Sequence, residues 1–240
     1  MPKSFIKIKP VKSYSEKHNE RVVKPKYLIQ PMVENLSIST STISKRLDKI
    51  KTAVKEKTGR TMQKKATPIR EAVILLPDDN NKLNKAALIN LSNSLKDRFG
   101  IEAFQIHIHN DEGHQEPGGA VKYNYHAHIV FDWMNHETGK SYKLTREDMS
   151  EMQTMTAELL SMERGLKGSK NLSLTHREYR GYMTIKDVLL KQLKINKLSE
   201  KEDKSIRKAI IDKRNNGDQR ANQSETGRTR EKNNKRSFKR

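Results

Sequence analysis

Two His-x-His pairs, each set among alternating apolar residues, constrain the fold of this chain more than any other feature. The pairs are His107-Ile108-His109 and His126-Ala127-His128. Because residues i and i+2 of a β-strand share a face, each pair directs two imidazoles to the same side of its strand. The apolar residues of the two segments then point to the other side, into a core: Ile106, Ile108, Ala127, Ile129 and Phe131.

A metal site follows if these two strands are neighbours in one sheet. Glu112 comes soon after His109, so three imidazoles and one carboxylate would converge on a single ion. Such a mixed set of ligands suits a divalent ion such as Mn, Mg or Zn. His109 is better placed beside Glu112 than His107 is, so we expect His107 to support the site or to lie beside it. The alternative interpretation is a polar strand face that binds no metal.

The charge of the chain narrows the classes of partner. The 240 residues carry a formal net charge of +20, which favours a polyanion, with nucleic acid as the first candidate. A basic protein of the membrane surface would need an amphipathic helix with bulky apolar anchors, and none stands out. Cysteine is absent, which excludes disulfides, thiolate zinc sites and cysteine nucleophiles. No segment is apolar enough to span a bilayer and no signal peptide is evident, so we expect no membrane partner and a cytoplasmic location.

The remaining apolar pattern predicts strands and helices in alternation. We expect strands at 4–9, 71–76, 101–109 and 123–133, and helices around 43–54, 88–99, 152–162, 185–193 and, more weakly, 199–211. The expected helix-end signals are Ser41, Gly59, Gly100, a capping box at Thr145-Arg146-Glu147-Asp148, and Gly165 with Gly168. Residues 11–35 are polar and irregular. Because only the loop 110–122 joins the two histidine strands, we predict an α+β fold, an antiparallel or mixed sheet flanked by helices.

A second polar motif, His18-Asn19-Glu20-Arg21, lies near the N-terminus, outside any periodic segment. Alone, a histidine among lysines in a polar loop is typical of a solvated side chain. A catalytic role for this histidine becomes more plausible in a chain that also has a metal motif and a strong positive charge. A neutral imidazole can attack phosphorus, and an adjacent arginine can neutralise phosphate oxygens.

Together with His109-Asn110-Asp111-Glu112 and His126-Ala127-His128, this motif resembles the MobV-type (Mob/Pre) plasmid mobilisation relaxases of the HUH endonuclease superfamily. The motifs follow the order of that family. The resemblance implies an HUH relaxase-like fold with a helical C-terminal extension. We therefore predict a relaxase domain at 1–180, a helical extension at 181–212, and a basic tail at 213–240 that is too polar to order itself.

The resemblance also implies a reaction and its residues. The ligands of a divalent ion, Mn²⁺ or Mg²⁺, would be His109, Glu112, His126 and His128. His18 would attack a phosphodiester of single-stranded DNA at an origin of transfer and form a covalent 5′-phosphohistidine, and the strand would later be rejoined. Arg21 would stabilise charge on the phosphate, and Glu20 would accept or orient the imidazole proton. The oligomeric state stays open.

Basic residues after the catalytic region are expected to contact DNA phosphates. Met162-Glu163-Arg164-Gly165 and the basic segment behind it resemble the linker of the family. The candidate contacts are Arg164, Lys167, Lys170, Arg177 and Arg180. A solvated helix or loop face is the alternative interpretation.

One departure from the family pattern concerns the loop between Glu112 and His126, which is longer than usual. Its His114 or Glu116 would be able to compete for the metal. The sequence leaves that competition open.

Two other functions compete with a histidine relaxase. A rolling-circle replication initiator would use a tyrosine nucleophile. For that initiator, Tyr142 is too close to the second histidine strand, and Tyr179 and Tyr182 stay open. Tyr14 and Tyr27 flank His18 and are the alternative nucleophiles, since related HUH enzymes use tyrosine, or else structural rings. A rival from another class is a non-catalytic, metal-stabilised nucleic-acid-binding protein. Only the two enzymes would form a covalent protein–DNA adduct, so detecting one would rule out the non-catalytic binding protein.

Overall fold

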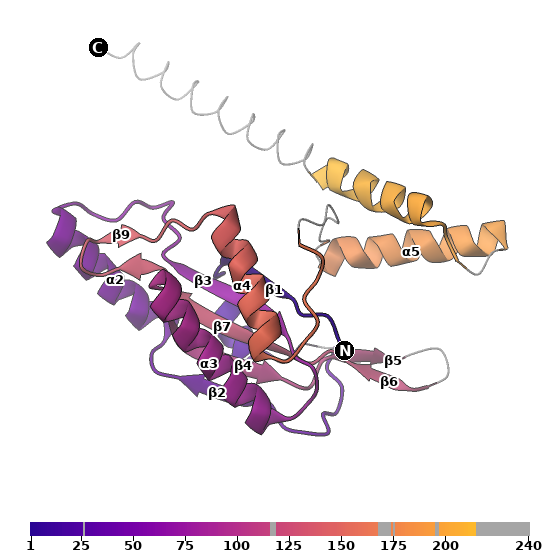
Figure 1. The fold of residues 1–240 in the computed structure, drawn as a ribbon, viewed down its shortest axis with the longest axis horizontal. Coiled ribbons are helices and arrows are strands. Elements are labelled where there is room, and N and C mark those ends of the chain that lie inside the picture. Colours follow the sequence, from indigo (N-terminus) through magenta and orange to yellow (C-terminus); the bar gives the residue numbers. More distant parts are fainter. Residues whose placement is uncertain (26, 116–118, 168–173, 175, 195–196, 215–240) are drawn as a thin grey trace, which may run out of the picture. The chain divides into compact units, whose positions relative to one another are not determined.

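A five-stranded antiparallel sheet with the order β1-β3-β7-β4-β2 carries both histidine pairs (Figure 1). Its strands are β1 (Ile6–Pro10), β2 (Leu36–Ser39), β3 (Ile69–Leu75), β4 (Glu102–His109) and β7 (His126–Asp132). The computed structural model describes all residues except 26, 116–118, 168–173, 175, 195–196 and 215–240. The chain falls into two units, Met1–Lys167 and Gly168–Arg240, and the sheet lies in the first. The predicted α+β class with an antiparallel sheet is confirmed.

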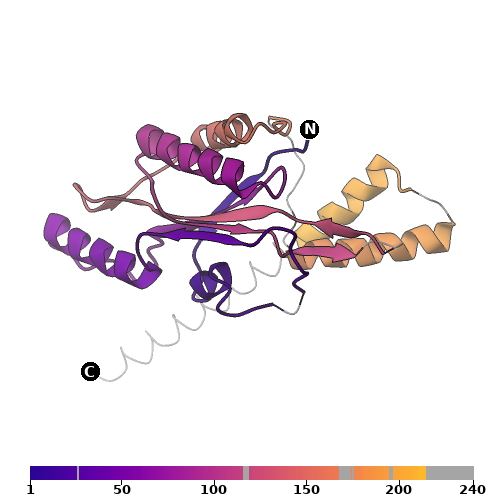
Figure 2. The same cartoon turned by 90° about the horizontal axis from the view of Figure 1, so that it is seen from below.

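One face of the sheet packs against α3 (Asn81–Phe99) and α4 (Arg146–Leu159), which lie together on one side in Figure 2. The five apolar residues expected to point away from the histidines are all buried in this core: Ile106, Ile108, Ala127, Ile129 and Phe131. Leu88, Leu91 and Leu95 meet them from α3. Burying a large apolar side chain stabilises the folded state by about 1.5–3 kcal/mol, so this face is the main source of stability. The same pattern fixes the strand register, because a shift by one residue would turn these side chains to the other face.

The opposite face is shared between an apolar half and a polar half. At one end α2 (Ile43–Thr58) places Ile50 and Val54 against Ile69, Val130 and Met134. At the other end the short helix α1 (Ser15–Asn19) lies over the histidines. Figure 2 shows α1 and α2 on the same side of the sheet, away from α3 and α4. The polar half of this face is therefore the part of the sheet left for chemistry.

Most helix ends follow the predicted signals. Gly59 and Gly100 adopt left-handed conformations that end α2 and α3, with φ of 66° and 76°. The capping box at the start of α4 is present, with Thr145 and Asp148 bonding each other's backbone N–H groups. The cap of α2 is Thr42, whose hydroxyl accepts from Lys45, and the prediction of Ser41 is wrong by one residue.

The predicted end of α4 at Gly165 and Gly168 is also wrong, because the helix ends at Leu159. Ser161 turns left-handed with φ of 51°, and the N–H of Met162 bonds the carbonyl of Ala157 at 2.8 Å. This bond across five residues closes the helix in the manner of a Schellman motif and returns Met162 to the core.

Several short elements were not predicted. Residues 11–35 contain α1, residues 36–39 form the edge strand β2, and the expected loop 110–122 holds a hairpin of β5 (Gly113–Gln115) and β6 (Val121–Tyr123). The expected strand 123–133 is interrupted before His126, and a further small hairpin, β8 (Met134–Asn135) with β9 (Lys140–Ser141), follows β7.

The second unit contains α5 (His176–Leu193) and a helix at 200–214, which confirms both predicted C-terminal helices. Tyr182 is buried within this unit and donates a hydrogen bond to Asp203. Arg207 stacks over the ring of Tyr182 at 4.4 Å and bonds Asp203. The predicted domain limits at 180 and 212 stay predictions, and the predicted tail lies outside the described residues from 215 onward.

Candidate active site

The antiparallel register of β4 and β7 brings the two histidine pairs face to face. His107 lies opposite His128, and His109 lies opposite His126. All four side chains are buried on the face that α1 partly covers. The neighbouring strand β3 adds Glu71 to the same face. Glu71 pairs with Val130, two residues along β7 from His128, and its side chain reaches His128 diagonally. The predicted adjacency of the two histidine strands is therefore confirmed.

The predicted ligands come together at one end of this face. Nδ1 of His109 is 3.4 Å from Nε2 of His126, and Oε1 of Glu112 is 3.8 Å from that same Nε2. The rings of His109 and His128 have centroids 4.9 Å apart. Two overlapping groups have ligand atoms within 4.8 Å of one another: His109, Glu112 and His126, and His18, His109 and His128.

Hydrogen bonds fix which nitrogen of each ring points inward. Nε2 of His109 faces the carbonyl of Asn19 at 2.9 Å, and Nδ1 of His126 faces the carbonyl of Asn124 at 2.8 Å. Both nitrogens must donate, because a carbonyl oxygen can only accept. The other nitrogen of each ring, Nδ1 of His109 and Nε2 of His126, then carries a free lone pair at the point where the rings meet.

His128 supplies the clearest sign that the residues fit a metal ion. Its Nδ1 lies 2.8 Å from Oε1 of Glu71, so this nitrogen donates to the carboxylate. Its Nε2 is buried and has no hydrogen-bond partner. A buried acceptor without a partner is costly, and an imidazole held by a carboxylate at one nitrogen is the usual support for a metal bond at the other.

The electrostatics of the site keep the imidazoles of His109 and His126 neutral at neutral pH. Burial, with charge repulsion from His128, lowers the pKa of His126 to about 4 and places that of His109 well below its usual value. A neutral imidazole is the form that binds a metal. Burial alone raises the pKa of Glu71, but its bond with His128 and the His128 charge outweigh that effect and lower the pKa to about 2.

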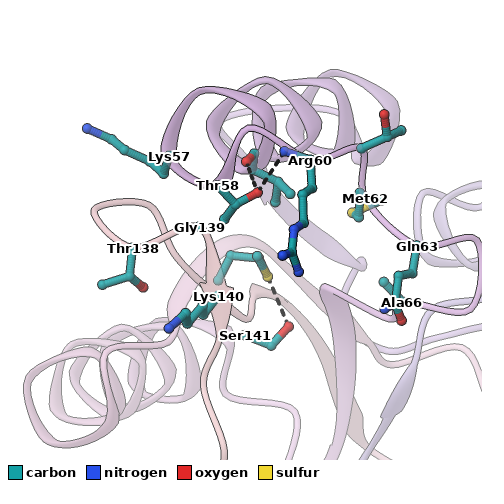
Figure 3. A pocket seen from close by; sticks show the side chains of 13 residues that line it. Lys57, Thr58, Arg60, Met62, Gln63, Ala66, Thr138, Gly139, Lys140 and Ser141 are labelled. Atoms are coloured by element: carbon teal, nitrogen blue, oxygen red, sulfur yellow. Dashed lines mark hydrogen bonds between the residues drawn. The ribbon is translucent and has the colours of Figure 1, made fainter.

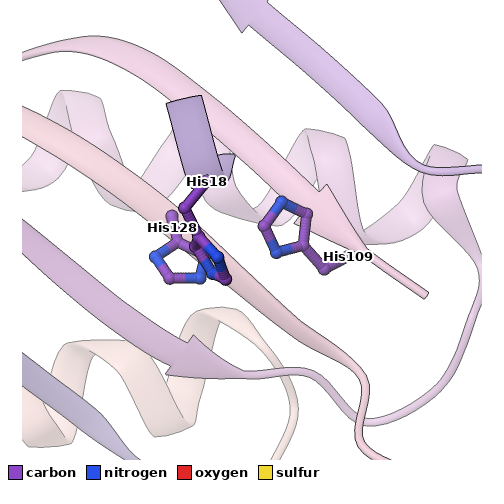
Figure 4. A group of neighbouring side chains, drawn as sticks. All are labelled: His18, His109 and His128. Carbon is purple, nitrogen blue, oxygen red and sulfur yellow. The ribbon is translucent and has the colours of Figure 1, made fainter. Parts of the chain in front are cut away.

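His18 lies directly over this cluster (Figure 4). Its ring centroid is 5.3 Å from that of His128 and 5.6 Å from that of His109, and its Nε2 is 3.9 Å from Oε1 of Glu112. Burial and the nearby His128 and Arg21 charges lower its pKa, so its lone pair is available at neutral pH. The expectation that residues 11–35 are irregular is wrong here, since His18 lies in α1, and its side chain is 26% exposed.

Several polar contacts hold α1 in place, although a five-residue helix has little stability of its own. Ser15 and Asn19 both donate to the Glu71 carboxylate, at 3.1 and 2.7 Å. Oε1 of Glu16 accepts from the side chain of Gln105 at 2.8 Å and from the backbone N–H of Ile43 at the start of α2 at 2.7 Å. The position of His18 thus depends on β3, β4 and α2 together.

Arg21 is engaged by carboxylates. Its Nε and Nη2 bond both oxygens of Asp111, at 3.1 and 2.6 Å, and Nη2 also bonds Oε1 of Glu112 at 2.8 Å. The residue adopts φ of 56°, a conformation uncommon outside glycine, and its side chain is 9% exposed. The predicted contact of Arg21 with phosphate stays a prediction, while its contacts tie the chain after His18 to the loop after β4.

The other predicted residues near the site are placed away from the centre. Glu20 is exposed at the end of α1. His107 bonds the hydroxyl of Ser37 at 2.9 Å and belongs to neither group of ligand atoms. His114 is exposed on β5, and Glu116 lies outside the described residues.

The predicted DNA contacts after Met162 are placed only in part. The guanidinium of Arg164 bonds the hydroxyl of Thr154 at 2.6 Å and the carbonyl and hydroxyl of Ser150 at 3.0 Å, so it holds the chain onto α4. Lys167 is exposed. Lys170 lies outside the described residues, and Arg177 and Arg180 lie in α5 with side chains that are not described. Their contacts with DNA stay predictions.

Two functional residues were missed by the sequence reasoning, Glu71 and Asn19. Glu71 looked like the first residue of a buried strand, yet the alternation of β3 places it opposite Ala72 and Ile74, on the histidine face. That alternation was a usable signal. The role of Asn19 depends on its backbone carbonyl, which no side-chain pattern reveals.

The tyrosines proposed as rival nucleophiles differ in exposure. Tyr14 and Tyr27, on either side of His18, are 57% and 51% exposed. Tyr142 packs against Gly100, where a Cβ would lie 2.5 Å from its ring. Tyr182 is buried within the second unit.

Among the described residues, no helix is both long and apolar enough to cross a membrane.

Comparison with known proteins adds a family and a fold. The family model "Relaxase: MobA/VirD2-like, nuclease domain" matches residues 27–166. The MobM relaxase domain (MOBV; Mob_Pre) bound to plasmid pMV158 oriT DNA, in a Mn-bound crystal structure at pH 6.8, shares 20% identity over 75% of this chain and 99% of that domain, with a TM-score of 0.58. A second Mn-bound structure of that domain with a 23-nucleotide DNA shares 18% identity over 75% and 98%, with a TM-score of 0.56. None of the curated proteins compared with the chain matches it.

Proposed function

The chain belongs to the relaxase family of MobA/VirD2-like nuclease domains, and on that premise we propose that it is a metal-dependent relaxase that nicks and rejoins single-stranded DNA at an origin of transfer. Its sheet has the fold of the MobV relaxase domain of MobM. The relaxase would serve the mobilisation of a plasmid or another mobile element. The reaction would proceed through a covalent link between His18 and the 5′ end of the nicked strand.

A single arrangement carries this proposal. Three buried imidazoles donate from their outer nitrogens to Asn19, Asn124 and Glu71, which leaves three lone pairs beside the carboxylate of Glu112. A fourth imidazole, that of His18, lies against the same group, and the His18 side chain is 26% exposed to solvent. The buried rings suit a metal ion, and the exposed one suits an attack on a substrate.

The residues that would hold the ion are His109, Glu112, His126 and His128. The Mn ion in the MobM structures and the mixed nitrogen and oxygen ligands here both favour Mn²⁺, with Mg²⁺ as the alternative. When bound, the ion would supply Lewis-acid polarisation of the non-bridging oxygens of the phosphodiester. His114, exposed on β5, belongs to neither group of ligand atoms.

His18 would act as the nucleophile. Its depressed pKa keeps the ring neutral, so a ring nitrogen can attack phosphorus without first losing a proton. The N–P bond forms as the P–O3′ bond breaks, and the departing 3′ oxygen takes up a proton from solvent. The phosphoramidate keeps the 5′-phosphate activated, so a 3′-hydroxyl can later attack the same phosphorus and release His18 without ATP.

α1 and Arg21 would hold the nucleophile against the cluster. The bonds of Arg21 to Asp111 and Glu112 join the chain after His18 to the loop that carries the carboxylate ligand. Such contacts would hold the imidazole in position for attack, and orientation of this kind can supply a large part of a rate enhancement. Glu20, exposed at the end of α1, would reach the imidazole proton only through solvent.

Detection of a covalent protein–DNA adduct tests the proposed reaction. The protein is incubated with labelled single strands from the origin region of its element and Mn²⁺, and the products are separated on a denaturing gel. We expect a labelled band at the size of the protein, which disappears with a chelator and with His18→Ala. An adduct that survives His18→Ala but is lost in Tyr14→Phe or Tyr27→Phe would favour a replication-initiator chemistry. Binding with no adduct under any condition would favour a non-catalytic DNA-binding protein.

A further inference from the structure

A pocket of about 570 Å³ lies at the opposite end of the histidine face, between the last turn of α2, the segment that follows it, and the β8–β9 hairpin. Figure 3 shows the Arg60 side chain pointing from the end of α2 toward the strand that carries Lys140 and Ser141. Met134, the first residue of β8, forms part of the wall. The pocket therefore sits where the polypeptide leaves β7, the strand that begins with His126.

The walls of this pocket combine cationic and polar side chains with a smaller apolar set, Val54, Met62, Ala66 and Met134. Lys57, Arg60 and Lys140 line it together with Thr138 and other small polar residues, and no lining residue is acidic. None of the three cationic side chains makes an ion pair within the part of the chain that the structure describes. Three uncompensated cations around one concave surface attract an anion that can enter the concavity.

The geometry of the pocket is fixed by close backbone packing. A Cβ added at Gly139 would lie 3.0 Å from the Thr58 side chain, 3.2 Å from that of Lys57 and 3.3 Å from the backbone of Val54, so the hairpin packs closely against the end of α2. The carbonyls at this helix end are partly neutralised, since Thr58 donates to Val54 at 2.6 Å and Lys55 donates to Gly59 at 3.3 Å. The negative end of the helix dipole is thus offset where an anion would approach.

The pocket and the histidine cluster lie on one face of one sheet. His126, His128 and Val130 alternate onto that face along β7, and Met134 packs with Val130 beneath α2. Eight residues at roughly 3.3 Å each place the pocket about 26 Å from the ligand end of β7. α2 spans part of this distance, and lysines 45, 49, 51, 55 and 57 on its surface are exposed.

We propose that this pocket binds a backbone phosphate of the same DNA molecule whose scissile phosphate lies at the histidine cluster. Arg60 and Lys140 are the side chains that contact it, and the exposed lysines of α2 follow the DNA between the two points. The inference rests on the proposed function, because it assigns a second anchor to that DNA. A contact to phosphate positions DNA without reading its sequence, so this anchor sets where the strand lies over the site.

The experiment compares the full chain with the double variant Arg60→Ala, Lys140→Ala. Binding is measured by fluorescence anisotropy with single-stranded oligonucleotides of mixed sequence, from about 6 to about 30 nucleotides, at several salt concentrations. Each lost phosphate contact lowers the log–log salt slope by about 0.7, which corresponds to about a fivefold loss of affinity at 0.1 M salt. We expect this loss for the long oligonucleotides and none for the shortest, which cannot reach both sites.

The matched control is Lys82→Ala, Lys85→Ala. These exposed lysines lie in α3, on the other face of the sheet, and the change removes the same charge. Equal losses in the control and the pocket variant would overturn the proposal, because net charge alone would explain them. An unchanged salt slope in the pocket variant, or an equal loss with the shortest oligonucleotide, would also overturn it. Failure of the unaltered chain to bind DNA would instead contradict the proposed function.

Discussion

At the scale of the residue, hydrogen bonds to the outer nitrogens decide what the histidines can do. Glu71 holds Nδ1 of His128, and the carbonyls of Asn19 and Asn124 hold the other two rings. Each bond selects one tautomer and directs one lone pair inward. The ligand set therefore depends on residues that bind no metal themselves, and Glu71 is the one that a substitution can test.

We predict that Glu71→Gln lowers the affinity for Mn²⁺ by about 10- to 100-fold, as loss of a carboxylate behind a metal-binding histidine does elsewhere. The glutamine keeps the size of the side chain but can also donate to Nδ1, which favours the wrong tautomer of His128. Isothermal titration with Mn²⁺ measures the effect. Glu102→Gln serves as a control, because Glu102 pairs with Arg46 at the far end of the sheet. Equal affinities in the Glu71 variant and the unaltered protein would show that Glu71 does not support the site.

The buried His107 predicts a pH dependence of the metal-free protein. Burial lowers its pKa from 6.5 to about 4, so between these values the unfolded chain binds a proton that the folded chain does not. The free energy of unfolding should be constant above pH 6.5 and fall as the pH drops toward 4. The contribution of His107 reaches about 3 kcal/mol at full shift.

Chemical denaturation at a series of pH values, with a chelator present, measures this dependence. His107→Asn should make the slope between pH 6.5 and 4 shallower. Part of the fall remains, because the pKa values of His18, His109 and His126 are also lowered in the folded protein. The same slope in the variant and the unaltered protein would contradict the assignment of a neutral, buried His107.

At the scale of the element, long periodic segments were predictable and short polar ones were not. The core-facing residues of β4 and β7, the helices α2 and α3 and the capping box of α4 all followed from local pattern. α1 has five residues and no apolar period, and it is held by the hydrogen bonds that Ser15 and Asn19 donate to Glu71. Arg21, which follows the helix, bonds Asp111. Such tertiary contacts have no local sequence signal.

The residues of the candidate site were likewise predictable only in part. Strand alternation placed the histidines on one face, and the family resemblance supplied the ligand set and the nucleophile. The supporting residues Asn19, Glu71 and Asp111 act through partners more than 50 positions away or through a backbone atom. The hairpin inside the expected loop was also missed, because β5 and β6 have only three residues each.

We predict that Asp111→Asn loosens α1. The change removes the charge partner that bonds Nε and Nη2 of Arg21, so the segment after His18 loses its main tether. Hydrogen exchange of the amides of residues 15–21 should accelerate, while the amides of β4 and β7 keep their protection. Asp48→Asn, on the exposed surface of α2, is the control. Unchanged exchange at residues 15–21 would mean that Arg21 and Asp111 do not anchor the helix.

At the scale of the whole molecule, the formal net charge of +20 should make DNA affinity steeply dependent on salt. Residues 213–240 hold ten of the basic residues and three of the acidic ones. Deletion of this stretch should weaken binding to all sequences alike and flatten the salt slope, while the nicked phosphodiester stays the same. Nick mapping and anisotropy at several salt concentrations check both parts. A shifted nick would show that the segment also takes part in sequence choice.

If His18 forms the bond to DNA, the nicked strand stays attached to that residue, and the linked residue can be mapped. The adduct made with Mn²⁺ is digested with a protease and a nuclease, and the peptide that carries the residual nucleotide is sequenced by mass spectrometry. A phosphoramidate hydrolyses in acid whereas a phosphotyrosine survives, so a second portion is treated with acid before digestion. We predict a nucleotide on His18 that acid removes. An acid-stable nucleotide on Tyr14, Tyr27 or any other tyrosine would contradict the account.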